Sequence, residues 1–319
     1  MEPGSGGLQE MSGVDWRKIY RRDRPYIPGR PEGWNPSLPD SPKPRAKIAI
    51  HILLFLLTLF TTLVAGALQE GVNPLDTPGQ IYKGFPFSFA LMAILLAHEL
   101  AHYGVARRHG MNVTLPYFIP APSFIGTFGA FIKMRSPARD RKVLLDVGAA
   151  GPLVGVAFAI PLLIIGLKLS EVRVIQAQMG THLGSSILLH LTSWILFGPL
   201  PEGTDIIIHP VGFAGWIGLL VTSLNLIPVG QLDGGHIAYA LLGEKQNIIS
   251  KIVFAGLLVL GIFGWPGWLL WALLLFLMGF RHPPPLDGWV PLDRKRKMIG
   301  WLAVVVFGLT FIPVPFSGF

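Results

Sequence analysis

Long apolar segments constrain this chain more than any other feature of its sequence. A helix needs about 20 predominantly apolar residues to cross a bilayer. Charged residues make up only 14% of the chain, whereas about 25% is typical of soluble domains. The sequence therefore predicts an all-α polytopic membrane protein with about seven transmembrane helices. The candidates are Lys47–Leu68, Phe85–Ala106, Val143–Leu167, Ile206–Pro228, Ile248–Phe263, Pro266–Phe280 and Met298–Ile312.

Basic residues gather between these segments and indicate an orientation. Lys and Arg are enriched in the cytoplasmic loops beside membrane spans. Seven spans that start from a cytoplasmic N-terminus place every basic cluster on the cytoplasmic side. A further crossing at Leu183–Leu200 would put Lys245 outside, so we expect that stretch to be re-entrant or interfacial. The basic residues of these cytoplasmic loops then account for the net charge of +8. We therefore expect no nucleic-acid partner.

The N-terminal segment differs from the rest of the chain. Residues 1–45 are rich in Pro, Gly and charged residues, which predicts a largely disordered cytoplasmic tail. Residues 46–319 form the polytopic membrane domain, with a core at about 85–242 and C-terminal helices at 248–315. We expect a multi-pass protein of a bacterial cell membrane, with a plastid membrane as the alternative. Its oligomeric state stays open.

One segment between two apolar runs has the composition of strands and turns. Met111–Arg135 combines β-branched and aromatic residues with Pro and Gly. Non-helical backbone is tolerated at membrane depth only where protein or water covers it. We therefore expect a small membrane-associated β element here, whose edge strand could hold an extended peptide by β-augmentation.

The strongest chemical motif is HELAH at residues 98–102, inside an apolar segment. A spacing of four places His98 and His102 on one face of a helix, so both imidazoles can reach one metal ion. Glu99 can act as a general base toward a metal-bound water. A charge at the centre of a span costs about 2.5–3.5 kcal/mol on insertion scales. The motif predicts a metal-dependent hydrolase, and polar residues near a helix end are the alternative.

A second motif, NLIPVGQLDGG, covers residues 225–235 and follows another apolar segment. Pro228 ends or kinks the preceding helix, and Gly234 and Gly235 let the backbone approach a metal or a substrate. Catalytic zinc usually has three protein ligands and one water. Asp233 would lie at a depth similar to that of HELAH, which makes it the candidate third ligand. A turn carboxylate that caps a helix is the alternative.

Together the two motifs resemble the site-two protease family of intramembrane zinc metalloproteases. The resemblance covers about Phe85–Leu242 and rests on HExxH followed by NxxPxxxLDG. It implies one zinc ion (Zn²⁺) per chain, bound by His98, His102 and Asp233, with Glu99 catalytic. It also implies cleavage of peptide bonds within or beside transmembrane segments of membrane protein substrates in the lipid bilayer.

Two further features refine the resemblance. The run Gly151–Gly155 is similar to a third family element, in which an asparagine often stands where this chain has Gly155. The extra C-terminal spans and the lack of room for a PDZ-sized insert resemble one branch of the family. That branch includes bacterial homologues and the chloroplast ethylene-dependent greening proteins.

Asn225 is the second candidate for catalysis. A buried amide in an apolar span needs a partner. We expect its side chain to face the metal, where it could hydrogen-bond the substrate carbonyl and the oxyanion that develops from it. The alternative is an amide that packs between helices. His236, one turn beyond Asp233, could support the ligands from outside the ligand set.

Three other functions use similar residues. A metal transporter explains histidines inside the membrane, but it does not explain Glu99 between them. A CaaX-type membrane metalloprotease would be expected to have a glutamate as third ligand, in place of the LDGG motif. A non-catalytic scaffold derived from a protease would have no need of Glu99.

Overall fold

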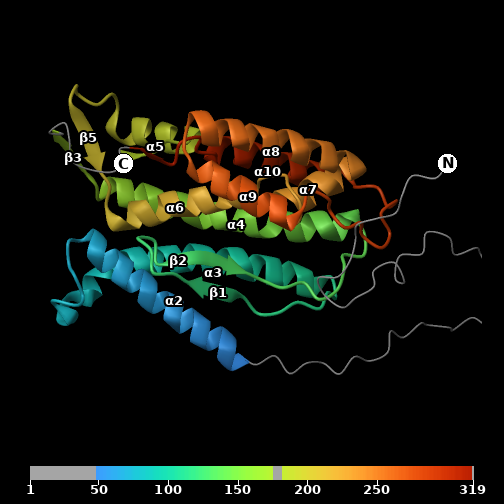
Figure 1. Cartoon of the computed structure of the whole chain (residues 1–319), viewed down its shortest axis with the longest axis horizontal. Helices are drawn as coiled ribbons and strands as arrows, with labels where there is room; N and C mark the ends of the chain where they lie inside the picture. Colours follow the sequence, from blue (N-terminus) through green and yellow to red (C-terminus); the bar gives the residue numbers. More distant parts are fainter. Residues whose placement is uncertain (1–47, 175–181, 318–319) are drawn as a thin grey trace, which may run out of the picture. The chain divides into compact units, whose positions relative to one another are not determined.

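The computed structural model of the chain describes residues 48–174 and 182–317 (Figure 1). The predicted tail at residues 1–45 lies outside these ranges. Four segments of the described chain are long and apolar enough to cross a membrane. The protein is therefore a multi-pass membrane protein. The segments are α2 (Ile48–Gln69), η1 with α3 (Pro78–Gly84 and Phe85–Arg108), α4 (Arg141–Lys168) and the run of α7, η2 and α8 (Asp233–Leu242, Gly243–Lys245 and Gln246–Phe263).

The remaining helices are shorter, so seven full-length spans are not confirmed. α6 (Pro210–Asn225) has 16 residues and α9 (Gly267–Met278) has 12. α10 (Arg294–Thr310) has 17 residues and begins with four basic ones. α6 ends early because Pro228 cannot continue a helix, and α9 ends at Gly279, whose φ of 86° is left-handed.

The stretch Leu183–Leu200, which we expected to be re-entrant or interfacial, contains the short helix α5 (Ile187–Phe197). Its 11 residues extend about 16 Å at 1.5 Å per residue. The hydrocarbon core of a bilayer is about 30 Å thick. By length, both α5 and the 12-residue α9 are shorter than this core.

The described residues contain three small antiparallel sheets of two strands each. The expected β element after the HELAH helix is the hairpin β1–β2, which packs against α2 and α3. Thr61 of α2 holds its turn by donating a 2.6 Å hydrogen bond to the carbonyl oxygen of Gly126. The sheets pair β1 (Tyr117–Pro120) with β2 (Thr127–Phe131), β3 (Glu171–Val174) with β5 (Thr204–Ile207), and β4 (His182–Leu183) with β6 (Phe316–Ser317).

The helix α4 occupies the centre and packs against α3, α6 and α7. Glycines make the close approach to α6 possible. A Cβ atom at Gly166 would lie 1.9 Å from the backbone nitrogen of Gly212, and one at Gly215 would lie 2.7 Å from that of Leu163. Small residues of this kind let membrane helices approach closely. The packing brings the HELAH helix and the start of α7 to the same face of α4.

Candidate metal centre

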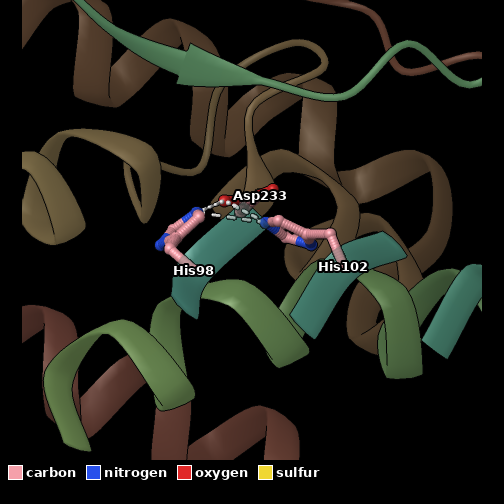
Figure 2. Close-up of side chains that lie close together, drawn as sticks. All are labelled: His98, His102 and Asp233. Carbon is pink, nitrogen blue, oxygen red and sulfur yellow. Dashed lines mark hydrogen bonds and ion pairs between the residues drawn. The ribbon is translucent and has the colours of Figure 1, made fainter. Parts of the chain in front are cut away.

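Two helices bring three candidate ligands together. His98 and His102 project from α3, and Asp233 is the first residue of α7 (Figure 2). The Nε2 atoms of the two histidines lie 3.1 Å apart. The Oδ2 atom of Asp233 lies 3.4 Å from His98 Nε2 and 3.2 Å from His102 Nε2. One donor atom of each residue therefore points at a common position.

The geometry of these three atoms fits a metal ion. Tetrahedral ligands at 2.0–2.1 Å from zinc are separated from one another by about 3.3 Å. The observed separations of 3.1, 3.2 and 3.4 Å match that value. In the described ranges, this is the one group of three such side chains that could hold a metal ion. Both histidines are buried and Asp233 is largely buried. Burial favours a metal site whose ligands neutralise most of the charge of the ion.

The carbonyl oxygen of Val147 in α4 fixes the tautomer of His102. His102 Nδ1 lies 2.7 Å from it, and a carbonyl oxygen can only accept a hydrogen bond. Nδ1 therefore carries the hydrogen, which leaves the lone pair on Nε2, the atom that points at Asp233. Such a hydrogen bond commonly orients a metal-binding histidine.

The glycines of the LDGG motif pack against the chain that precedes them. A Cβ atom at Gly234 would lie 1.9 Å from the carbonyl oxygen of Leu226, and one at Gly235 would lie 2.4 Å from that of Gly230. They make room for the preceding turn of the chain. This packing places Asp233 in the first turn of α7, where the helix dipole favours a carboxylate.

The run Gly151–Gly155 lies directly against the ligands, which the sequence did not establish. A Cβ atom at Gly151 would lie 2.0 Å from His102 Nε2. One at Gly155 would lie 3.0 Å from His98 Nδ1. One turn earlier, a Cβ atom at Gly148 would lie 2.8 Å from the Cβ of His236. α4 thus presents a row of glycines to the histidines. The GPLVG run at residues 151–155 is the sequence pattern that indicates this contact.

Glu99 is buried beside His98 and does not belong to the group of three ligands. Its carboxylate interacts with the backbone of Ile132, the residue that follows β2. A green strand runs above the three ligand side chains in Figure 2, and β2 packs against α3. The hairpin therefore borders the site on the side of Glu99.

Asn225 is the last residue of α6. Its Nδ2 atom lies 3.4 Å from His98 Nε2. The amide therefore lies beside the imidazole of His98.

A pair of buried histidines adjoins the ligands. His236 Nδ1 lies 2.5 Å from His282 Nε2, and His282 Nδ1 lies 2.6 Å from the carbonyl oxygen of Pro283. Tyr239 stacks on the His282 ring at 4.9 Å. Burial, followed by the nearby His236, lowers the pKa of His282 from 6.5 to about 3, so this imidazole is neutral. The loop before α10 therefore folds back onto α7, which the sequence does not reveal.

A charged cluster joins α10 to the central helix near the ligands. Arg296 donates through Nε and Nη2 to both carboxylate oxygens of Asp146, at 2.8 and 2.7 Å. His109 Nε2 lies 3.0 Å from the same carboxylate. Asp146 precedes Val147, so this cluster fixes the part of α4 that orients His102.

Several known proteins with similar sequences are named as probable zinc metalloproteases. The protein named probable zinc metalloprotease EGY2, chloroplastic, from Oryza sativa subsp. indica is 32% identical over 82% of this chain and 49% of its own length. The Arabidopsis thaliana protein named probable zinc metalloprotease EGY1, chloroplastic, is 29% identical over 83% of this chain and 53% of its own length. Probable zinc metalloprotease EGY3, chloroplastic, from rice is 29% identical over 72% and 42%.

The chain spans about half the length of the curated relatives it matches. No solved structure matches it. The sequence profile described as peptidase family M50 matches residues 86–263, more than half of the chain. That range includes all three candidate ligands, Glu99 and Asn225, and the match confirms the resemblance to site-two proteases. The chain belongs to peptidase family M50.

Proposed function

We propose that this chain is an intramembrane zinc metalloprotease that hydrolyses peptide bonds in or near transmembrane segments of membrane proteins. The observation that carries the proposal is the convergence of His98, His102 and Asp233 at 3.1–3.4 Å, with Glu99 beside them. Membership in peptidase family M50 and the relatives' names support the same chemistry.

The three ligands hold one zinc ion per chain. A bound zinc ion supplies a Lewis acid and lowers the pKa of water towards about 7. The two neutral imidazoles and the single carboxylate keep the total charge of the loaded site low inside the membrane.

Glu99 moves the proton in this reaction. Its carboxylate takes a proton from the attacking water and later passes it to the leaving amine nitrogen. The Asn225 amide, 3.4 Å from His98 Nε2, donates a hydrogen bond to the oxygen of the carbonyl under attack. Donors of this kind typically contribute about 10²–10³ in rate.

The β1–β2 hairpin binds the substrate in extended form. Helical carbonyl groups are already hydrogen-bonded, so a transmembrane substrate must unwind before it is cut. Among the described residues, β2 pairs with β1 alone, and the residue after β2 interacts with Glu99. A substrate strand added beside β2 would pass close to the general base.

The orientation follows the basic residues. The N-terminus and the loops that contain Arg139 and Arg294 face the cytoplasm, or the stroma if the membrane is that of a plastid. The names of the relatives support the plastid alternative over the bacterial one. Seven helices cross the membrane: α2, α3, α4, α6, α8, α9 and α10.

The direct test reconstitutes the purified chain in proteoliposomes with a model single-span membrane protein. We expect cleavage of this substrate in the wild type and none in Glu99→Gln. A parallel zinc-flux measurement distinguishes a transporter, which would move zinc across the vesicle membrane without cutting the substrate. Zinc flux without cleavage contradicts the proposal. Membrane proteins that accumulate in cells with Glu99→Gln would identify natural substrates.

A further inference from the structure

A cavity of about 290 Å³ is lined by residues of α7, α8 and α10. Every residue that lines it is apolar or aromatic. It extends along α7 from Gly234, next to Asp233, to Leu242 at the end of the helix. The walls include Ala238, Ile249 of α8, and Trp301 and Phe307 of α10.

One end of this cavity is basic. Lys245 lies four residues before Ile249, in helical conformation at the start of α8, and Lys297 lies four residues before Trp301 on α10. Residues four apart share a helix face, so both lysines lie one turn beyond the lining residues. Both are exposed. A Cβ atom at Gly300 would lie 2.9 Å from the Leu241 side chain, so this part of α10 adjoins the end of α7 that leads to Lys245.

We infer that the cavity binds one acyl chain of an anionic phospholipid, whose phosphate is held by Lys245 and Lys297. The apolar walls suit an acyl chain, and the paired lysines suit a phosphate at the membrane surface. The volume lies at the lower end of that of ligand pockets, about 300 Å³. A substrate helix, about 10–12 Å across with its side chains, does not fit.

The cavity lies beside the candidate metal centre, but none of the three candidate ligands lines it. Gly234 and Leu226, which line the inner end, adjoin Asp233 and Asn225 in the sequence. Binding is measured without turnover, so its outcome is independent of the proposed proteolysis.

Native mass spectrometry of the full chain tests this inference. The probes are phosphatidylglycerol and phosphatidylcholine with identical acyl chains, offered at equal concentration. We expect the wild type to retain phosphatidylglycerol preferentially. A juxtamembrane lysine contributes roughly fivefold to the binding of an anionic lipid, so Lys245→Gln with Lys297→Gln should lower the preference by roughly 25-fold.

A matched double variant controls for net charge. Lys251→Gln with Lys295→Gln removes two exposed lysines from other faces of the same two helices, and it should keep the preference. An equal loss in both double variants, or in neither, overturns the inference.

Two cavity-filling variants test the acyl chain itself. Ala238→Phe from α7 and Ile249→Trp from α8 should each lower the retention of both lipids at unchanged thermal stability. Should Ala238→Phe fail to fold, Ile249→Trp tests the same prediction from the opposite wall. Undiminished retention in a folded filled variant contradicts the inference.

A photoreactive amino acid at Val304, which also lines the cavity, identifies the occupant in proteoliposomes. A phospholipid adduct is expected. Crosslinking to a second copy of the chain, or to a transmembrane substrate peptide, overturns the assignment.

Discussion

His102 Nδ1 and the carbonyl oxygen of Val147 lie 2.7 Å apart, so α4 sets the tautomer of a ligand that α3 supplies. Asp146, one residue earlier, accepts two hydrogen bonds from Arg296 of α10. The orientation of one proposed metal ligand thus depends on helices that are distant in the sequence. Loss of such a supporting contact typically costs about 10–100-fold in metal affinity.

The proposed ligand set predicts the metal content of the purified protein. The wild type should contain about one zinc per chain, whereas His98→Ala and Asp233→Ala should each lower this content strongly. Elemental analysis measures it. His190→Ala, which changes an exposed histidine outside the group, is the control and should keep the zinc. Unchanged zinc in both ligand variants would exclude the proposed ligands.

Gly151→Ala should disrupt the metal site by steric contact. The added Cβ would lie 2.0 Å from His102 Nε2, so the ligand must move, and we expect a loss of about tenfold or more in zinc affinity. Gly104→Ala is the matched control, because a Cβ at that position would meet no atom of the described residues within 4 Å. Equal zinc affinity in both variants would show that the row of glycines does not set the ligand geometry.

Glu99→Gln should separate metal binding from turnover. The zinc should stay, because Glu99 is not among the three ligands, while the attacking water loses its proton acceptor. We expect the cleavage rate of a model membrane substrate to fall by about 10²–10⁴. Glu202→Gln removes an exposed carboxylate far along the chain and serves as the control. Cleavage near the wild-type rate in Glu99→Gln would refute the proposed proton transfer.

Asn225→Ala should lower kcat by about 10²–10³ if the amide stabilises the oxyanion. Zinc content and thermal stability should be unchanged, since His98 keeps its other contacts. A packing amide in a membrane contributes about 0.6 kcal/mol to stability. A loss of stability with normal turnover in the folded fraction would favour that packing role.

Single cysteines test the topology, and the native chain has none. Cysteines at Arg139 and Arg294 should react with an impermeant thiol reagent from one side of the membrane, and a cysteine at Asp205 should react from the other. If the positions 139 and 294 are labelled from opposite sides, α5 crosses the membrane after all.

The sequence alone determined the chemistry of the site. Helical periodicity requires that His98 and His102 share a face, and an apolar segment made their polar groups conspicuous. The LDGG motif supplied the third ligand candidate, and strand composition located the hairpin after α3. Each of these inferences depends on residues that are close in sequence or on the solvent that surrounds them.

Only the tertiary structure decided what surrounds the ligands. Asp233 meets His102 across 131 positions of sequence, and the metal-compatible spacing arises from the packing of α3 and α7 against α4. The same packing brings Gly151 against His102 and His282 against His236. It also places the carbonyl oxygen of Leu226 so close to Gly234 that no side chain fits there. Helix lengths also depend on it: α6 and α9 are shorter than their apolar segments, because hydropathy does not specify where a buried turn replaces a helix. Contacts of this kind depend on distances between remote segments, which local patterns do not encode.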